Sequence, residues 1–308
     1  MFKPAILLIP LVLCSCAPRQ DNVVARSDDG KPPEALFPVK TEGGQYGYID
    51  RSGKLVLKGP YAGASRFAEG LAAVQMKKAG KVGYIDTTGK LVIPLQFDLG
   101  DWFSEGVAAV MVNHKWGYVD KTGKLVIPFS FGIAQPFESG RAAVGTGPTG
   151  EFGFINTKGE FPLANRYEMA MPYREGLAAV RSFTERVKFI DMDGKPAIPP
   201  QFLAAGEFVD GLAPVQAQTP QGVRWGFVDK QGKMAIPAEY ANALPFAEGL
   251  APVQALSGKW GFVDAKNTMV IPPDWDQAGQ FTYGLSQVWN GKKFGYIGKD
   301  GKYVWPIQ

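Results

Sequence analysis

The sequence predicts an all-β protein built from tandem repeats, and three observations lead to this prediction. A block typified by residues 115–128 recurs along most of the chain with a mean period of about 35 residues, which lies in the range of solenoids and propellers. The block has the pattern of a hairpin, with an aromatic and β-branched limb, an Asp-x-x-Gly turn and an aliphatic limb. The 308 residues include 38 glycines and 24 prolines, a composition typical of a turn-rich β protein rather than a disordered chain.

The chain begins with the pattern of an export signal. Residues 4–13 form an apolar run that is too short to span a bilayer but suits a secretory signal. The run Leu13-Cys14-Ser15-Cys16 resembles the bacterial lipobox, and this resemblance implies that Cys16 carries a lipid. We therefore predict a lipoprotein signal peptide over residues 1–15, and an acylated Cys with a flexible tether over residues 16–35.

The residue after Cys16 indicates where such an anchor would place the chain. It is Ala17 rather than Asp, and by resemblance to sorted lipoproteins this implies the bacterial outer membrane, with the chain facing the periplasm or the cell surface. A Gram-positive source would place it on the cytoplasmic membrane, and the alternative without a lipid is a soluble secreted protein cut near Ala17. Cys14 and Cys16 are the only cysteines, so no disulfide would remain after processing and stability would come from packing.

The repeat itself is counted from a glycine that follows an aromatic or Val residue. Seven copies hold this glycine and a degenerate eighth copy has Lys188 in its place; the glycines are Gly47, Gly83, Gly117, Gly153, Gly226, Gly261 and Gly295. The motif Lys259-Trp260-Gly261-Phe262-Val263-Asp264, followed by Ile271-Pro272-Pro273, resembles the bacterial WG-repeat family, as does the motif over residues 246–253. The resemblance covers roughly residues 36–308. It is specific for the repeat type and implies no particular ligand.

Further fixed spacings complete each unit. An aromatic residue lies fourteen positions after the first glycine, a second aromatic six positions later, and a second glycine three positions after that. The second aromatics are Phe67, Phe103, Phe137, Tyr173, Phe208, Phe246 and Phe281. A short strand follows the second glycine, so each unit is predicted to be a three-stranded antiparallel meander. We expect proline, as at Pro128, to end the third strand, and the stretch between the two aromatics to be a tight or helical turn.

The units are predicted to stack face to face, because alternate side chains place apolar residues on both faces of each sheet. Eight whole meanders fill residues 36–308, and no strand is left over at one end to complete a sheet at the other. On this ground we favour an open superhelical solenoid over a closed eight-bladed propeller. The propeller stays open as the alternative, because eight is a common blade number and a propeller can close without a shared blade.

Most residues that could suggest catalysis have a structural interpretation. His114 is the only histidine, lies in a loop and has no His or Cys cluster around it, so we expect no metal site and no Ser-His-acid system. The acidic residues before the second glycine recur in most units and are expected to accept turn N–H groups; they are Glu69, Glu105, Glu175, Asp210 and Glu248. The hairpin aspartates, including those of Asp191-Met192-Asp193-Gly194, are interpreted as turn residues rather than calcium ligands.

The three tryptophans of the WG position are interpreted as core residues. Trp116, Trp225 and Trp260 could stack on sugars, but other units hold Phe, Tyr or Val at this position. Replacement by Val favours a packing role over a sugar platform.

The candidate binding face combines a basic row with the variable loops. The residue before the WG position is basic in six units, as Lys81, Lys115, Arg186, Arg224, Lys259 and Lys293. Stacked units would set these residues in a row along one edge, where they either attract an anionic partner or discourage strand addition. All length variation also falls in the loop before these residues, so that the loops either form a binding face or vary because nothing constrains them.

The sequence therefore predicts a non-catalytic binding or scaffolding module of the bacterial cell envelope, with a protein or an anionic envelope polymer as its partner. The net charge of +4 gives no support to nucleic-acid binding, and no cofactor is implied. The alternative is a carbohydrate-active enzyme on a propeller-like repeat fold. Such an enzyme would bring unrepeated polar residues, for example a carboxylate pair, to one pocket, whereas the sequence shows its variety spread along one face.

Overall fold

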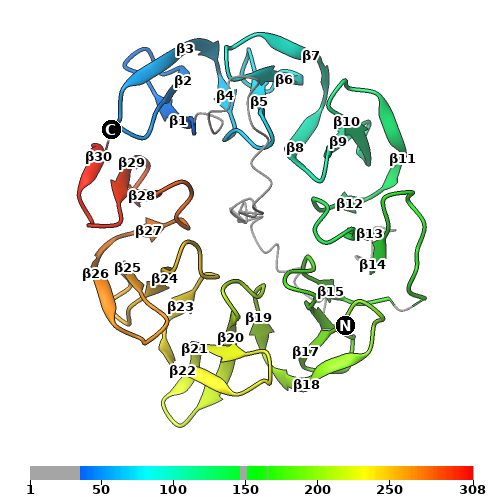
Figure 1. Cartoon of the computed structure of the whole chain (residues 1–308), viewed down its shortest axis with the longest axis vertical. Helices are drawn as coiled ribbons and strands as arrows, with labels where there is room; N and C mark the ends of the chain where they lie inside the picture. Colours follow the sequence, from blue (N-terminus) through cyan, green and yellow to red (C-terminus); the bar gives the residue numbers. More distant parts are fainter. Residues whose placement is uncertain (1–34, 146–150, 165, 308) are drawn as a thin grey trace, which may run out of the picture.

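Eight small antiparallel sheets form a closed ring in the computed structural model of the chain (Figure 1). The structure describes residues 35–145, 151–164 and 166–307; the predicted signal peptide and Cys16 lie outside them. The sheets are blade 1 with β1 (Phe37–Lys40), β2 (Tyr46–Ile49) and β3 (Leu55–Tyr61); blade 2 with β4 (Gly63–Ala64), β5 (Leu71–Gln75), β6 (Val82–Asp86) and β7 (Leu91–Phe97); blade 3 with β8 (Leu99–Ser104), β9 (Val107–Val112), β10 (Lys115–Asp120) and β11 (Leu125–Phe131); and blade 4 with β12 (Ile133–Ala134), β13 (Ala142–Gly145) and β14 (Phe152–Ile155).

The second half of the ring repeats this plan. Its sheets are blade 5 with β15 (Met169–Ala170), β16 (Ala178–Arg181), β17 (Val187–Ile190) and β18 (Pro196–Phe202); blade 6 with β19 (Ala204–Ala205), β20 (Leu212–Thr219), β21 (Gly222–Asp229) and β22 (Met234–Tyr240); blade 7 with β23 (Asn242–Ala243), β24 (Ala251–Gln254), β25 (Trp260–Val263) and β26 (Met269–Trp275); and blade 8 with β27 (Gln277–Ala278), β28 (Leu285–Asn290), β29 (Lys293–Gly298) and β30 (Tyr303–Trp305).

Six of the eight blades have four strands within the described residues, not the three that the sequence predicts. The extra strand is the innermost one, and it comes from the stretch between the two aromatics, which is therefore neither a tight nor a helical turn. In blade 3 the chain leaves the outermost strand β11 at Phe131 and starts the inner strand β12 of blade 4 at Ile133. Inner strands of mostly two residues are too short for the alternation of a sequence pattern to reveal them.

The predicted end of the third strand at proline is also wrong. Strand β11 runs through Pro128 to Phe131, and β7 runs through Pro94 to Phe97. These strands form the outer edge of their blades, where an N–H group has no ladder partner, so that proline costs no hydrogen bond. Proline on an exposed edge also blocks the addition of a strand from another chain.

The glycine of the WG position lies under a bulge in the outer strand, which leaves little room for a side chain. In blade 3, Trp116 pairs with Phe131 but Tyr118 pairs with Ile127, so extra residues of β11 bulge over Gly117. A Cβ atom on Gly117 would lie 2.7 Å from the carbonyl oxygen of Ile127, a distance that no side chain tolerates without a shift of the backbone.

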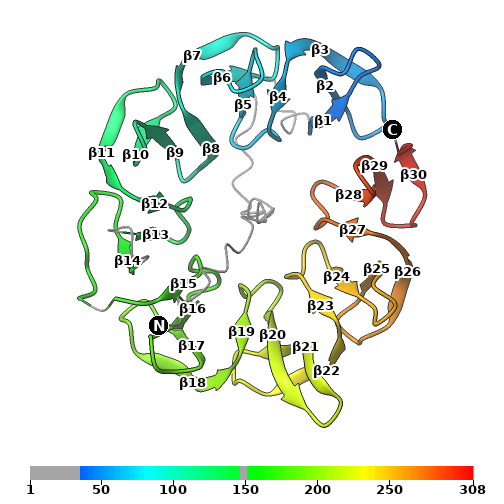
Figure 2. The same ribbon diagram turned by 180° about the vertical axis from the view of Figure 1, so that it is seen from behind.

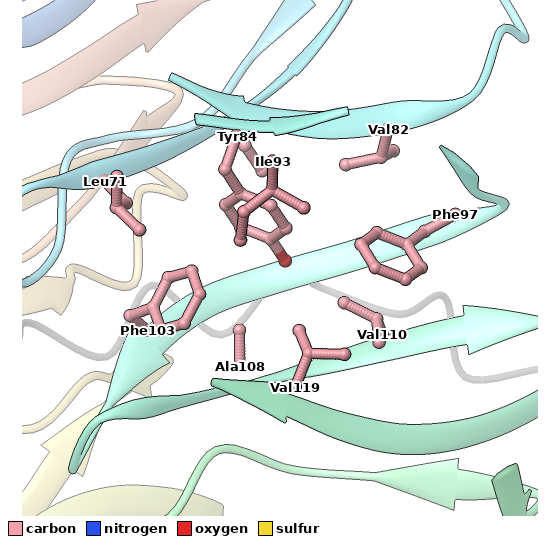
Figure 3. Close-up of a cluster of buried hydrophobic side chains, with 10 residues drawn as sticks. Leu71, Val82, Tyr84, Ile93, Phe97, Phe103, Ala108, Val110 and Val119 are labelled. Atoms are coloured by element: carbon pink, nitrogen blue, oxygen red, sulfur yellow. The ribbon is translucent and has the colours of Figure 1, made fainter. Parts of the chain in front are cut away.

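The hydrophobic core lies between the blades. Each of the eight buried clusters combines residues of two neighbouring blades, and Figure 3 shows the cluster between blades 2 and 3. Its centre is Tyr84 of β6, whose ring lies 5.0 Å from that of Phe103 and 6.5 Å from that of Phe97. The hydroxyl group of Tyr84 donates a hydrogen bond of 2.8 Å to the carbonyl oxygen of Asp101 in blade 3. The two aromatics at fixed spacing, here Phe97 and Phe103, thus pack against the strand that holds the WG position, which is the third of the four strands of a blade.

The ring closes between blades 8 and 1, so the favoured open solenoid is wrong and the eight-bladed propeller is correct (Figures 1 and 2). The Phe37 and Tyr296 rings lie 5.5 Å apart, and the Tyr296 hydroxyl group donates to the carbonyl oxygen of Pro38 at 3.0 Å. An open stack would leave one apolar sheet face exposed at each end. Closure buries both faces, because the blades widen from short inner strands to outer strands of up to seven residues and so curve round an axis.

We predict that the second aromatic ring is essential to the interface between blades. Phe246 is 1% exposed, and its ring lies 4.9 Å from that of Phe227 in the preceding blade. The change Phe246→Ala should lower the free energy of unfolding by about 3–5 kcal/mol, because it leaves a cavity in a packed core. Hydrogen exchange should become faster in β21 and β24. Unchanged thermal unfolding together with unchanged exchange would show that the ring is not part of the core.

We also predict that the WG glycine and its degenerate copy respond differently to alanine. Gly117→Ala should destabilise the fold by about 1–3 kcal/mol, because the new methyl group meets the backbone of β11. Lys188→Ala is the matched control, since blade 5 already holds a side chain at this position, and it should be close to neutral. Equal effects of the two changes in chemical denaturation would contradict the bulge as the reason for the glycine.

Candidate binding faces of the ring

The order of the strands gives the ring two different faces. Successive strands of a blade are antiparallel, so the loops that follow the first and third strands emerge on one face, which we call the turn face. The loops between the second and third strands, and the links between blades, emerge on the opposite face, which we call the variable face. Its described loops are residues 41–45, 76–81, 113–114, 151, 182–186, 220–221, 255–259 and 291–292.

The turn face is held together by a belt of carboxylates. Glu105 has a φ of 54° and Gly106 one of 84°, so this pair forms a type I′ turn that places a non-glycine residue in the left-handed region. The Glu105 carboxylate accepts the N–H group of Gly140 in the next blade at 2.9 Å. Equivalent bonds join Glu69 to Gly106, Glu175 to Gly211, Asp210 to Gly249 and Glu248 to Gly284.

This belt confirms that the acidic residues accept turn N–H groups. The N–H group belongs to the turn of the following blade, however, and not to the turn that holds the acidic residue. The carboxylates also pair with lysines of the adjacent hairpin turns, as in Lys121–Glu69 at 3.0 Å and Lys230–Glu175 at 2.9 Å. A left-handed residue other than glycine costs on the order of 1 kcal/mol, and bonds between blades offset this cost. Repetition round the ring thus reflects assembly rather than catalysis.

The hairpin aspartates are turn residues, as predicted. The Asp120 carboxylate accepts the N–H groups of Thr122 at 2.9 Å and Lys124 at 3.0 Å, and also the Thr122 hydroxyl group at 2.6 Å. The hydroxyl bond, together with the backbone bonds, holds the pKa of Asp120 below its usual value. In Asp191-Met192-Asp193-Gly194, the Asp191 carboxylate accepts the N–H groups of Asp193 and Lys195, so this motif closes a turn.

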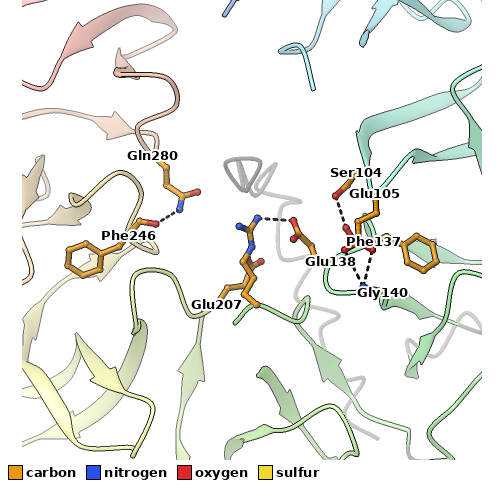
Figure 4. A network of polar contacts seen from close by, with 9 residues as sticks. Ser104, Glu105, Phe137, Glu138, Gly140, Glu207, Phe246 and Gln280 are labelled. Atoms are coloured by element: carbon orange, nitrogen blue, oxygen red, sulfur yellow. Dashed lines mark hydrogen bonds and ion pairs between the residues drawn. The ribbon is translucent and has the colours of Figure 1, made fainter. Parts of the chain in front are cut away.

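Three charged residues on the inner side of the ring were missed by sequence reasoning. Arg174 of blade 5 pairs with Glu138 of blade 4 at 2.9 Å and with Glu207 of blade 6 at 2.8 Å, and all three side chains are at least nine-tenths buried. Figure 4 shows Glu138 and Glu207 near each other, with Ser104 beside Phe137 on one side of them and Gln280 beside Phe246 on the other. The sequence contains a weak signal for this cluster, because the residue after the second aromatic is Ala, Ser, Val or Thr in the units without Glu138 or Arg174, and no unit other than that of Glu207 has a carboxylate before it.

The cluster corrects the expectation that no unrepeated carboxylates converge. It stands at one of the two places where the described carboxylate belt is interrupted, since Ser139 occupies the acidic position of blade 4 and Tyr283 that of blade 8. Removing one partner of such a buried ion pair costs about 3–5 kcal/mol, because it leaves a charge without its counterion in a dry site. The arrangement therefore joins blades 4, 5 and 6.

A second unrepeated group lies in blades 2 and 3. The guanidinium group of Arg66 stacks on the Trp102 ring, 4.7 Å from its centroid. The Asp101 carboxylate accepts the N–H group of Trp102 at 2.8 Å. Burial raises the pKa of Asp101 to about 6, although this bond and the charge of Arg66 both favour the ionised form.

The six basic residues of the candidate face lie one per blade round the variable face and not in a row along an edge. They belong to the third strand of their blade or to the loop before it, and this strand is interior, so they cannot act by blocking strand addition. Lys81 pairs with Asp98, and Lys259 pairs with Asp276 at 2.9 Å. Arg224 donates to the neighbouring carbonyl of Val223 at 2.8 Å. The side chains of Lys115, Arg186 and Lys293 are exposed.

The two acidic partners explain part of the basic pattern. Asp98 also accepts the N–H group of Asn113, and Asp276 that of Gly291, in the variable loop of the next blade. Lys81 and Lys259 therefore belong to links between blades. Of the six basic residues, this leaves Lys115, Arg186 and Lys293, which are exposed, and Arg224, which is half-buried.

The remaining predicted residues lie where the sequence places them. His114 is exposed and shares a two-residue turn with Asn113, both having a positive φ. Trp260 is buried, whereas Trp116 and Trp225 are half-buried against the clusters between blades. None is a free aromatic platform. Within residues 35–145, 151–164 and 166–307 no group of three or more His, Cys, Asp or Glu side chains could hold a metal ion, and no helix is long and apolar enough to cross a membrane.

We predict that Asp101 makes stability depend on pH. Its pKa is raised in the folded state, so the folded state binds the proton more tightly and the free energy of unfolding falls as pH rises from about 4 to about 6. Asp101→Asn should be more stable than the natural chain at pH 7, by about 1–3 kcal/mol, and similar to it at pH 4.

Thermal unfolding at both pH values measures this difference. Asp98→Asn is the control with the opposite pH dependence. Lys81 and the Asn113 N–H group lower the pKa of Asp98, so the ionised Asp98 stabilises the natural chain at pH 7 and this contribution is lost as pH falls. An Asp101→Asn variant that is less stable at pH 7 would contradict the buried charge.

Solved structures resemble the ring at low sequence identity. The crystal structure of the eukaryotic initiation factor matches with a TM-score of 0.53 and 12% identity, over 89% of this chain and 95% of that one. The computationally designed Ika8 protein matches with a TM-score of 0.49 and 12% identity, over 88% and 95% of the two chains. BamB from Moraxella catarrhalis matches with a TM-score of 0.46 and 13% identity, over 78% and 82%. At such identities the first of these shows a likeness of fold alone.

No curated protein matches the sequence. A family model does match, and it is the model of the WG containing repeat. It matches seven times, over residues 46–78, 83–116, 116–147, 152–182, 189–217, 225–260 and 260–294. These matches span most of the ring and coincide with the repeated hairpins and the aromatic packing described above. The chain therefore belongs to the WG containing repeat family.

Proposed function

We propose that this chain is a non-catalytic binding module that presents the variable face of its propeller to a protein or an anionic envelope polymer. The observation that carries the proposal is the contrast between the two faces. On the turn face, the same carboxylate and the same aspartate turn recur in most blades and are engaged in bonds within or between blades. On the variable face, loop length and side chains differ from blade to blade.

Electrostatics supports an anionic partner. The exposed Lys115, Arg186 and Lys293 and the half-buried Arg224 lie on this face in four different blades. A ring of like charges attracts a partner of opposite charge and orients it before contact. The closed ring also fixes the positions of these loops, so that little conformational entropy is lost on binding.

We further propose that the module is anchored by a lipid on Cys16 and faces the periplasm or the surface of the bacterial outer membrane. The support is the lipobox-like run and Ala17 described above. A tether of flexible composition would leave either face of the ring free to meet a partner.

A carbohydrate-active enzyme remains the competing function, because Glu138 and Glu207 form an unrepeated carboxylate pair. Against it, both carboxylates pair with Arg174 and their side chains are 9% and 2% exposed. Hydrolysis of an envelope polysaccharide that disappears in Glu207→Gln, in a variant that still folds, would replace the binding proposal with the enzymatic one.

The binding proposal predicts a loss of capture on charge reversal. Lys115→Glu, Arg186→Glu and Arg224→Glu together should abolish retention of partners from envelope extracts, and retention by the natural chain should weaken as salt rises. Lys54→Glu, Lys90→Glu and Lys124→Glu, in hairpin turns of the turn face, form the matched control. Retention that survives the first triple change, or that does not respond to salt, would exclude the variable face as the site.

The anchoring proposal predicts that the lipid depends on one thiol. Metabolic labelling with a fatty-acid analogue should mark the natural chain and Cys14→Ser but not Cys16→Ala, because acylation needs the Cys16 thiol. Label that remains on Cys16→Ala would rule out this anchor.

A further inference from the structure

We infer that the docking surface on the variable face lies over blades 5 to 7 and takes a protein segment whose apolar side chains are flanked by Asp or Glu. This inference rests on the proposed binding function and narrows it to one class of partner. Three consecutive blades supply the surface. Its residues, which we call the mixed patch, are Phe183 and Arg186 of blade 5, Val223 and Arg224 of blade 6, and Leu256 of blade 7.

The apolar side chains of the mixed patch are unusually exposed. Leu256 is 65% exposed and Phe183 is 58% exposed, the two highest values among the large hydrophobic residues that the structure describes. Val223 lies near the tip of the β20–β21 hairpin and is 39% exposed. Three exposed apolar side chains on neighbouring loops of one face are typical of a protein contact surface.

Most of the other exposed hydrophobic residues have a structural origin that the mixed patch lacks. Leu91, Leu125 and Met269 occupy the same position at the start of the outer strand of their blades, next to the exposed Val92, Val126 and Val270. That position recurs because each outer strand has an open edge. The residues of the mixed patch lie instead in the loops and hairpin ends whose length varies between blades.

The variable face is also asymmetric round the ring. The corresponding loops of the other blades carry polar side chains, such as Lys77 and Lys78 in blade 2, Asn113 and His114 in blade 3, and Lys292 in blade 8. A partner that contacts all eight blades equally would not need apolar residues in three adjacent blades. The asymmetry therefore indicates a partner that contacts one arc of the ring.

The charges of the mixed patch favour an acidic partner. Arg186 is exposed, and Arg224 is half-buried and bonds to the carbonyl of its own neighbour, Val223. The nearby Glu185 is paired with Lys188 at 2.8 Å, so it is already neutralised by a lysine of the same hairpin. Arginines beside exposed Phe and Leu side chains form the combination that is enriched at protein interfaces, whereas a purely anionic polymer offers nothing to the apolar residues.

The loops that carry the mixed patch are held in place by their own hydrogen bonds. Strands β20 and β21 pair over eight positions up to Thr219 and Gly222, and the Thr219 hydroxyl group donates to the carbonyl of Gly222 at 2.7 Å. The loop of blade 7 is closed by the side chain of Gln254, which donates to the carbonyl of Gly258 at 2.8 Å. Such a surface loses little freedom on binding, which favours a specific contact.

The test uses the full chain and a displayed library of random linear peptides as the probe. Selection should enrich peptides that combine Phe, Leu or Trp with Asp or Glu, and their binding should weaken as salt rises. Phe183→Ser with Leu256→Ser should lower their affinity by about 30-fold or more, as expected for residues central to an interface. Leu125→Ser with Val126→Ser, two exposed apolar residues of an outer edge, is the matched control and should leave the affinity unchanged.

Each outcome separates this inference from the broader proposal. Thermal unfolding of both double variants should match that of the natural chain, because the changed side chains are exposed. A library that yields no binder, or binders that the Phe183→Ser/Leu256→Ser variant retains in full, would overturn the inference. Heparin serves as the purely anionic probe. If the charge reversals abolish heparin binding but no peptide depends on the mixed patch, the variable face binds anions as proposed and the inference of a protein partner is wrong.

Discussion

The structure depends on one constraint, which is that every blade has two apolar faces and can bury neither of them alone. The aromatic residue of the third strand, such as Tyr84, packs against an aromatic of its own outer strand and against one that the next blade supplies. Seven interfaces repeat a close aromatic pair between blades, and the Phe37–Tyr296 contact completes the circle. Since the core lies between blades rather than within them, closing the ring is what removes the last two apolar faces from water.

The two faces of the ring differ in what they contribute to stability and to recognition. The turn face supplies the polar bonds that hold the blades in sequence, as Glu105 does for Gly140. Where Ser139 interrupts these bonds between blades 4 and 5, the Glu138–Arg174–Glu207 cluster joins those two blades and also blade 6. The variable face has fewer such duties, because only Asp98 and Asp276 link neighbouring loops there among the described residues. The loops of that face can therefore differ in length and side chains from blade to blade. Such changes alter the surface that a partner contacts without disturbing the interfaces between blades.

The repeat type, the hairpins, the turn residues and the aromatic core were predictable from the sequence, because each depends on residue types at fixed spacing. Gly117 and Asp120 show this, since one fits under a bulge and the other binds turn N–H groups. The inner strands and the closure were not predictable. Two residues show no alternation, and the angle between neighbouring blades follows from their wedge shape and not from any one residue. The Glu138–Arg174–Glu207 cluster was missed because its members lie in different units and meet only when the ring forms. Phe183 and Leu256 were missed because the exposure of a loop residue cannot be read from its neighbours in sequence.

Closure of the ring is the central claim, and a distance across the seam between blades 8 and 1 tests it most directly. The guanidinium carbon of Arg51 lies 5.4 Å from the centroid of the Tyr283 ring. Spin labels on Arg51→Cys and Tyr283→Cys, with Cys14 and Cys16 replaced by serine, should therefore give a single short distance set by the label arms. An open stack would separate blades 1 and 8 by seven steps of roughly 10 Å each, or about 70 Å in all. A long distance of that order would contradict the closed propeller, whereas a short one is what the packing between blades requires.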